Sequence, residues 1–238
     1  MLLLNQVKKT KIIVALDYPT MSSAMKLVHM LDPSIFYLKI GKAMFTRFGV
    51  QLIRDLHKLK FKIFLDLKFH DIPNTVFYSV KAAADLGIWM LSIHILGGVN
   101  MLKSAKLALK NFSDTAPILI GVTVLTSLNQ NDLKAIGIIH SLRKQVFLLS
   151  NLAKQCCLDG VVCPGSEALN IKKKFGSDFK IVTPGVRLSK SSIHVHDQNQ
   201  IITPDLAKKF AIDYIVVGRP ITLSNNPILV LNNFYSML

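Results

Sequence analysis

Short apolar segments recur along the chain, and each is followed by a segment with the spacing of an amphipathic helix. Eight of these segments have the length and composition of β-strands, at residues 11–17, 36–41, 62–69, 89–94, 117–125, 160–163, 179–183 and 214–218. Strands that alternate with helices are typical of a parallel sheet covered on both faces. Eight such units in 238 residues predict an α/β fold, the TIM (β/α)8 barrel, which typically needs about 250 residues. We expect residues 1–238 to form this barrel as a single domain.

A doubly wound open sheet is the other arrangement that such units can adopt. Against it, the sequence has no Gly-x-Gly-x-x-Gly motif after the first expected strand and no visible linker. Helices are expected at residues 21–31, 74–86, 101–109 and 167–175, over a segment that includes residue 45 and runs towards 59, between 132 and 157, and from about 227 onward.

The apolar runs are too short to span a membrane, although half of all residues are hydrophobic. The three cysteines form an odd number without metal-ligand spacing, and Cys156 and Cys157 are neighbours. This pattern is typical of a reducing compartment. We therefore predict a cytoplasmic protein without a membrane partner.

The formal net charge is +15, from 29 basic and 14 acidic residues. Such an excess of positive charge is compatible with binding to nucleic acid, to an acidic membrane surface or to a small anionic substrate, and it does not distinguish among them. The lysines are spread along the chain, and the densest cluster, Lys172 to Lys174, lies on an expected helix. Because no nucleic-acid-binding motif accompanies them, we expect no nucleic-acid partner.

The third expected strand carries charged side chains, which are rare in an apolar strand. It belongs to the stretch 61–75, with the sequence FKIFLDLKFHDIPNT. Side chains alternate along a strand, so Phe64, Asp66 and Lys68 are expected to share one face. That face would be apolar at its beginning and would end in an ion pair.

Asp71 follows this strand, and Pro73 prevents the strand from continuing, so Asp71 is expected in a loop at the strand end. A purely structural interpretation makes Asp66 and Lys68 a salt bridge and Asp71 the cap of a helix that begins near Asn74. A buried ion pair is weak evidence for stability, because desolvation can exceed the Coulombic gain. The presence of the ion pair in this strand therefore suggests a role in function.

Polar residues also end other expected strands. In a TIM barrel the carboxyl ends of all strands meet at one mouth, where active sites lie. The residues expected to form a ring there are Asp17, Lys39, Asp66, Lys68, His94, Thr126, Arg187 and Arg219. Gly185 and Gly218 follow the last two strands, where barrels often bind phosphate, and arginine can donate two hydrogen bonds to phosphate oxygens.

These motifs together resemble the orotidine 5′-phosphate decarboxylases of the bacterial type, which carry an Asp-x-Lys-x-x-Asp motif. The resemblance lies in the segments VALD (14–17), LKIGKAMFTRFG (38–49), FLDLKFHDIPNT (64–75), VTVLTS (122–127), DGVVC (159–163), VTPGVR (182–187) and DYIVVGRPIT (213–222). It extends over nearly the whole chain, in order.

The resemblance implies decarboxylation of orotidine 5′-monophosphate to UMP and CO2, the last step of de novo pyrimidine synthesis. It implies neither a metal nor an organic cofactor. Lys68 would stabilise the carbanion at pyrimidine C6 and then protonate it. Asp66 and Asp71 would lie beside the departing carboxylate of the substrate, and Lys39 would complete an array of alternating charges.

The same resemblance assigns the remaining substrate contacts. Asp17 and Lys39 would bind the ribose region and Thr126 the pyrimidine. The phosphate end would be held by Gln198, Gly218 and Arg219 together with Arg187. Asp71 and Thr75 would reach the active site of a partner subunit, so the resemblance implies a homodimer.

The segment after Arg187 departs from the family pattern. Leu188-Ser189-Lys190 replaces the usual Pro-x-Gly, and the loop to Asp197 and Gln198 is longer. His194 and His196 in this loop superficially resemble metal ligands, but no third ligand is evident, and a surface loop is the better interpretation.

Two other functions fit parts of the sequence. Metal-dependent decarboxylases and synthases of keto-sugar phosphates share the Asp-x-Lys-x-x-Asp motif, but they place a carboxylate for Mg²⁺ where this chain has Lys39, and an ammonium group would repel that cation. A non-catalytic binder of nucleic acid or other polyanions is suggested only by the net charge.

Overall fold

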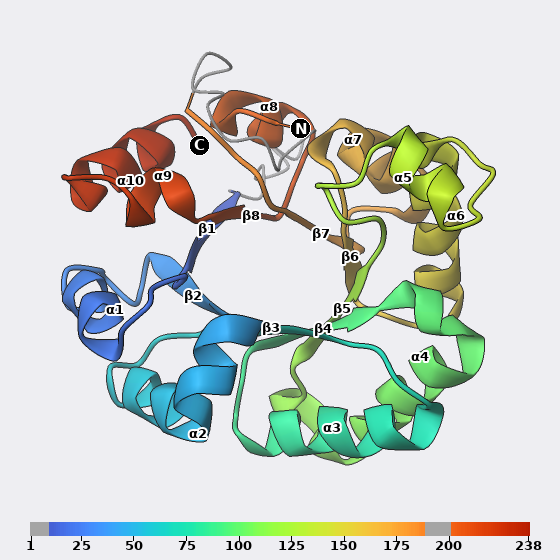
Figure 1. Cartoon of the computed structure of the whole chain (residues 1–238), viewed down its shortest axis with the longest axis horizontal. Coiled ribbons are helices and arrows are strands. Elements are labelled where there is room, and N and C mark those ends of the chain that lie inside the picture. The colour runs from blue at the N-terminus through green and yellow to red at the C-terminus, as the bar shows by residue number, and fades with distance from the viewer. Residues whose placement is uncertain (1–9, 189–200) are drawn as a thin grey trace, which may run out of the picture.

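Eight parallel strands form a closed barrel in a computed structural model that describes residues 10–188 and 201–238. The strands are β1 (Lys11–Ala15), β2 (Phe36–Gly41), β3 (Ile63–Phe69), β4 (Met90–His94), β5 (Ile118–Val122), β6 (Gly160–Val162), β7 (Lys180–Thr183) and β8 (Tyr214–Val217). They are arranged in chain order, and β8 pairs with β1 to close the ring (Figure 1). The predicted TIM barrel is confirmed, and the doubly wound open sheet is wrong.

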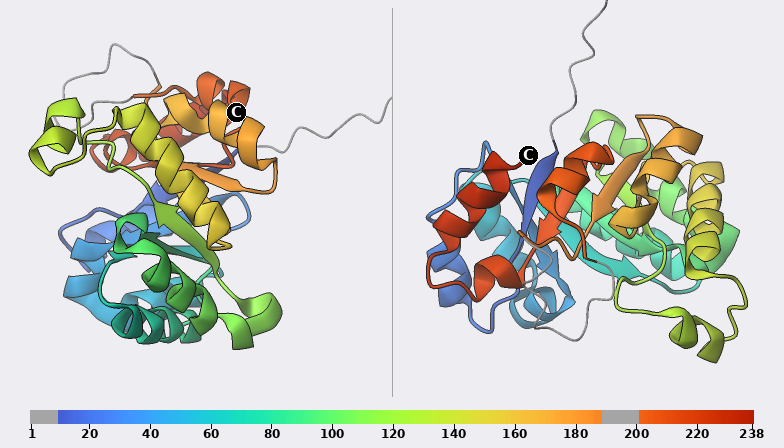
Figure 2. Two further views of the ribbon diagram at one scale, coloured as in Figure 1. Left: turned by 90° about the vertical axis from the view of Figure 1, so that its right-hand side faces the viewer. Right: turned by 90° about the horizontal axis from the view of Figure 1, so that it is seen from above.

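Helices surround the strands as an outer layer (Figures 1 and 2). They are α1 (Met21–Val28), α2 (Lys42–Lys58), α3 (Pro73–Asp85), α4 (Gly98–Ala108), α5 (Gln130–Ala135), α6 (Leu142–Gln155), α7 (Gly165–Phe175), α8 (Pro204–Lys209), α9 (Arg219–Thr222) and α10 (Pro227–Ser236), with short 3-10 turns η1 (Ile95–Gly97) and η2 (Lys110–Thr115). In residues 10–188 and 201–238, none of these helices combines the length and apolar character that crossing a bilayer requires.

The barrel interior is filled at its N-terminal end and open at the other. Alternate strand residues point inward and form a small core of Ile13, Ala15, Phe64, Met90, Ile120, Val182 and Val216. On the N-terminal side of this core, the rings of Tyr37, Trp89 and Tyr214 contact one another, with centroids 4.4–6.3 Å apart. As far as the described residues show, the barrel interior is therefore open at the carboxyl ends of the strands.

Strand β3 contains a β-bulge next to this opening. Its parallel register with β4 shifts between Leu65 and Phe69, and Lys68 adopts a positive φ of 50°. Bulges bend a strand and redirect a side chain, and they are common beside active sites. The strict alternation that we expected for Phe64, Asp66 and Lys68 is thus interrupted at Lys68, although all three side chains line the same cavity.

Candidate active site

A cavity of about 330 Å³ opens at the C-terminal mouth of the barrel. Apolar residues from the strands form its inner wall, and polar residues from the strand ends and the following loops surround it. The polar side chains that line it are Asp17, Lys39, Asp66, Lys68, Thr126, Ser127, Arg187 and Arg219. Seven of the eight residues expected to form a ring at the strand ends therefore meet here, and Ser127 joins them.

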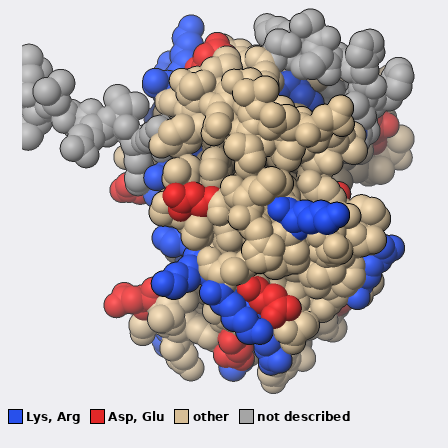
Figure 3. Space-filling model, turned by 90° about the vertical axis from the view of Figure 1, so that its left-hand side faces the viewer, with Lys and Arg blue, Asp and Glu red and all other residues tan. Residues whose placement is uncertain are grey.

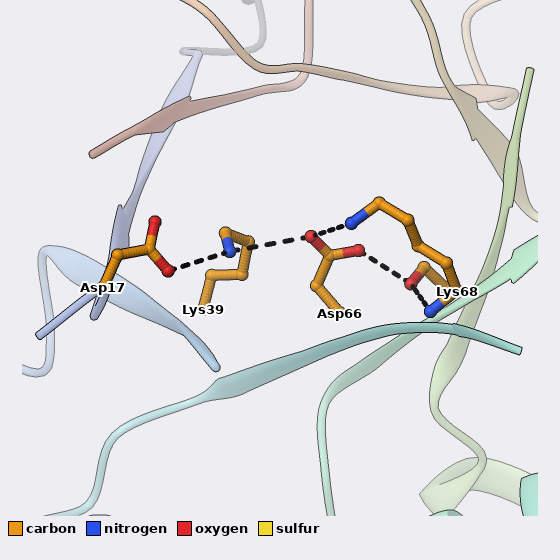
Figure 4. Close-up of polar contacts among 5 residues, drawn as sticks. Asp17, Lys39, Asp66 and Lys68 are labelled. Atoms are coloured by element: carbon orange, nitrogen blue, oxygen red, sulfur yellow. Dashed lines mark hydrogen bonds and ion pairs between the residues drawn. The ribbon is translucent and has the colours of Figure 1, made fainter. Parts of the chain in front are cut away.

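Four charged side chains of alternating sign lie in a row across the cavity (Figure 4). Lys39 Nζ lies 3.7 Å from Asp17 Oδ1 and 3.6 Å from Asp66 Oδ2. Lys68 Nζ lies 2.8 Å from the same Asp66 oxygen. Lys39 lies on β2, Asp66 and Lys68 lie on β3, and Asp17 follows the end of β1 by two residues, so neighbouring strands and a strand end hold the charges in place before any ligand arrives.

Asp66 is the most deeply buried carboxylate of this row, with 11% of its side chain exposed. Burial alone would raise its pKa, but the ammonium groups of Lys39 and Lys68 and hydrogen bonds from Lys68 and Ser92 outweigh that effect and lower the pKa. Asp66 is therefore ionised at neutral pH.

Ser92 of β4 is a neighbour of this row that sequence reasoning missed. Its buried hydroxyl donates a hydrogen bond to Asp66 Oδ1 at 2.8 Å and accepts one from the Lys68 backbone N–H at 2.9 Å. The only trace in the sequence is one hydroxyl within the apolar run Met90–His94. A single serine in a strand is not specific to any function, so this trace alone could not have identified the residue.

The loops after β7 and β8 form the cationic end of the cavity. Arg187 is buried, and its guanidinium Nη1 donates to the carbonyl of Val186 at 3.0 Å. Arg219 begins α9 directly after Gly218. Gly185 has a φ of 76°, a conformation that favours glycine, and it lets the backbone turn beside the cavity. Two guanidinium groups at one wall can bind a phosphate by paired hydrogen bonds.

Asp71 and Thr75 lie outside this cavity, and both are exposed. Asp71 Oδ1 accepts a hydrogen bond from the Ile72 N–H at 2.7 Å. Helix α3 begins at Pro73, its N-cap is Ile72, and no side chain caps it. The interpretation of Asp71 as a helix cap is therefore wrong, and within one chain Asp71 is not part of the charged row.

His94 also lies away from the cavity lining, so the expectation that it joins the ring is wrong. Its ring stacks on His70 at a centroid distance of 5.3 Å. Burial, together with the positive charges of His70, Lys42 and Lys68, lowers the pKa of His94 to about 4.

Three residues named from the sequence lie outside the described residues: Gln198, His194 and His196. Among the residues that are described, no group of three or more His, Cys, Asp or Glu side chains could hold a metal ion. The two carboxylates Asp17 and Asp66 share the Lys39 ammonium, so a cation placed between them would meet a positive charge.

A family model described as orotidine 5′-phosphate decarboxylase / HUMPS matches residues 10–234. The orotidine 5′-phosphate decarboxylase of Buchnera aphidicola subsp. Schizaphis graminum is 59% identical over 232 residues, which cover 98% of this chain and 97% of that protein. The protein of the same name from Actinobacillus succinogenes is 49% identical over 229 residues, covering 96% and 98%. A crystal structure of orotidine 5′-phosphate decarboxylase from Lactobacillus acidophilus superposes with a TM-score of 0.84 at 36% identity, covering 96% and 99%.

Proposed function

The chain belongs to the orotidine 5′-phosphate decarboxylase / HUMPS family, and we propose that its cavity converts orotidine 5′-monophosphate to UMP and CO2. This reaction is the last step of de novo pyrimidine synthesis. The observation that carries the proposal is the row of alternating charges, Asp17, Lys39, Asp66 and Lys68, in one cavity with two arginines. All three cysteines are unpaired thiols, which suits a cytoplasmic enzyme.

The chemistry explains why such charges are useful. When CO2 leaves, the electron pair remains on pyrimidine C6, where no conjugated group can accept it. The Lys68 ammonium, held by Asp66 at 2.8 Å, would stabilise this carbanion and then donate a proton to C6. Because the charges are already paired, they need little reorganisation during the reaction.

The remaining cavity residues would bind the nucleotide. Asp17 and Lys39 suit the ribose hydroxyls, and Thr126 suits the pyrimidine. Arg187 and Arg219, with the backbone at Gly218 and with Gln198, would hold the phosphate. Binding energy from the phosphate, which does not react, can be used to exclude water and orient the reacting carbon.

A homodimer would bring Asp71 and Thr75 to the cavity of the partner subunit. Both residues are exposed, and large apolar side chains around them are exposed as well. We define the α3–α4 surface by Ile72, Tyr78, Leu96 and Val99, which are 66%, 62%, 45% and 41% exposed. Tyr78 lies on α3 and Val99 on α4, Ile72 is the N-cap of α3, and Leu96 belongs to the turn η1 that precedes α4. Helices α3 and α4 pack side by side (Figure 1). An apolar surface of this kind suits association with another chain.

A metal-dependent enzyme acting on keto-sugar phosphates is disfavoured by Lys39, whose ammonium group occupies the space between two carboxylates. A polyanion binder would need basic side chains gathered on one face. On the face shown in Figure 3, basic and acidic side chains are interspersed.

Loss of the orotidine absorbance, followed with purified protein and orotidine 5′-monophosphate, tests the proposal. We expect turnover with EDTA present, and we expect Lys68→Ala to lower kcat at least about a thousandfold while UMP still binds. Lys58→Ala is the matched control, since this lysine is 72% exposed at the end of α2. Activity restored only by Mg²⁺ would favour the keto-sugar-phosphate enzyme. No turnover, together with DNA binding that falls steeply with salt, would favour the polyanion binder.

A further inference from the structure

The backbone of Lys68 is held in an unusual conformation. Its φ of 50° is rare for a residue with a side chain and is strained relative to ordinary strand geometry. The register shift between Leu65 and Phe69 takes Lys68 out of the regular β3–β4 ladder. Such a conformation persists only where surrounding contacts fix it.

The Ser92 hydroxyl supplies such a contact. It accepts a hydrogen bond from the Lys68 N–H at 2.9 Å, so a side chain on β4 replaces the backbone partner that the bulge removes. The same hydroxyl donates to Asp66 Oδ1 at 2.8 Å, while Asp66 Oδ2 accepts from the Lys68 ammonium at 2.8 Å. An ionised carboxylate can only accept, which fixes the direction of the hydroxyl proton.

We infer that Ser92 is a positioning residue for the decarboxylation, because its single hydroxyl fixes both the orientation of the Asp66 carboxylate and the bulged backbone that aims the Lys68 ammonium. This inference rests on the proposed function. The oxygen Asp66 Oδ1 and the Lys68 N–H would both lose this partner if the hydroxyl were removed. Lys68 could then relax toward regular strand geometry and carry its ammonium group away from the reacting carbon.

The decisive comparison is between Ser92→Ala and Ser150→Ala. Both serines are fully buried, and both substitutions remove one hydroxyl. Ser150 donates to the Val146 carbonyl within α6 and does not line the cavity. We expect Ser92→Ala to lower kcat about 10- to 100-fold with little change in KM, since hydrogen bonds to charged groups are the stronger ones. Ser150→Ala should keep the wild-type kcat.

The pH profile of kcat gives a second readout that loss of stability alone would not move. The hydrogen bond from Ser92 helps to lower the pKa of Asp66, so its loss should shift the acid limb of the profile to higher pH. The other charged groups around Asp66, namely Lys39 and Lys68 with Asp17 beyond Lys39, are unchanged in both variants. Ser150→Ala should leave the acid limb in place.

The outcomes distinguish the role of Ser92 from the proposed decarboxylase function. An active wild type with Ser92→Ala and Ser150→Ala equal in kcat and in pH profile would overturn the role of Ser92 and leave the proposed function standing. A folded wild type without decarboxylase activity would remove the proposed function and, with it, this inference. If Ser92→Ala does not fold, Ser92→Cys takes its place under the same criterion, because a thiol of similar size is a weaker hydrogen-bonding group.

Discussion

Asp66 connects more of the charged row than any other described residue. One of its oxygens lies near the ammonium groups of both Lys39 and Lys68, and the other accepts from Ser92. The desolvation that burial imposes is offset by these partners, so the carboxylate stays ionised in an apolar surrounding. At the scale of single residues, the cavity is therefore a set of charges that depend on one another.

His94 should make the stability of the protein depend on pH. Its pKa is lowered to about 4 in the folded chain, whereas an unfolded histidine has an ordinary pKa of about 6.5. As the pH falls from 6.5 toward 4, the unfolded chain takes up this proton first, and the folded state loses stability.

His94→Asn should therefore reduce the fall in Tm between pH 6.5 and pH 4. Allowing for the partial exposure of His94, we expect a difference of about 2–4 °C from wild type. Tm measured by scanning fluorimetry at several pH values checks this, with the exposed His29→Asn as the control. Parallel curves for wild type and His94→Asn would contradict the assignment.

Residues at the mouth of the barrel could be predicted where they lie at the end of an apolar strand or directly after it in the sequence. Asp66 and Lys68 stand out because charges are rare in an apolar strand, and Arg187 and Arg219 because they follow strands that commonly bind phosphate. His94 was misplaced because its position at the end of a strand does not show that its ring stacks on His70 instead of lining the cavity. Ser92 was missed because its role depends on the bulge in the neighbouring strand. No local sequence pattern predicts that bulge.

At the scale of elements, two aspartates tie neighbouring strands together at the N-terminal end of the barrel. Asp159 precedes β6, and its carboxylate accepts from the Leu119 N–H of β5 at 2.7 Å and from Lys106 at 3.0 Å. Its backbone carbonyl accepts from Lys180 of β7. One residue thus connects three consecutive strands at the end opposite to the cavity.

Asp213 repeats this arrangement before β8. Its carboxylate accepts from the Ile181 N–H of β7 at 2.8 Å and pairs with Lys172 at 2.7 Å, and its carbonyl accepts from Lys11 of β1. The side chains of Asp213 and Lys172 are only 8% and 10% exposed, whereas those of Asp159 and Lys106 are 38% and 37% exposed.

This difference in burial predicts a difference in stability. Asp213→Ala should lower the free energy of unfolding by about 3 kcal/mol, because it leaves a buried lysine without its counter-charge. Asp159→Ala, the matched substitution, should cost about 1–2 kcal/mol, since water can solvate Lys106. Urea unfolding of both variants measures the two losses. Equal losses would mean that burial of the ion pair does not control its contribution.

The elements themselves were largely predictable, because each strand is a compact apolar run and each covering helix shows a helical period. The segment between residues 132 and 157 was harder to interpret: it contains α6 and most of α5, which begins at Gln130, and both helices are capped. The side chain of Asn129 accepts from the N-terminal N–H groups of α5, and Ser141 caps α6. Gly137, with a φ of 83°, lies in the connection that separates them. Caps are set by a few polar atoms, so apolar periodicity does not reveal them.

At the scale of the whole molecule, the barrel separates two groups of residues that the sequence motif joins. Asp66 and Lys68 point into the cavity, while Asp71, only a few positions further, is exposed beside the α3–α4 surface. A single chain cannot supply Asp71 to its own charged row in this conformation. The proposed dimer resolves this separation, because symmetric association can place each Asp71 at the other subunit's cavity.

Hybrid dimers test this arrangement directly. Lys68→Ala and Asp71→Ala proteins should each be nearly inactive, but a hybrid dimer carries one site with an intact Lys68 from one subunit and an intact Asp71 from the other. Statistical mixing by co-expression should therefore restore about a quarter of the wild-type activity per site. A mixture of Lys68→Ala with Lys39→Ala is the matched control: both lysines belong to the same cavity, so no hybrid contains an intact site and no activity should return. Equal behaviour of the two mixtures would place Asp71 outside the partner's site and leave the α3–α4 surface without its proposed catalytic consequence.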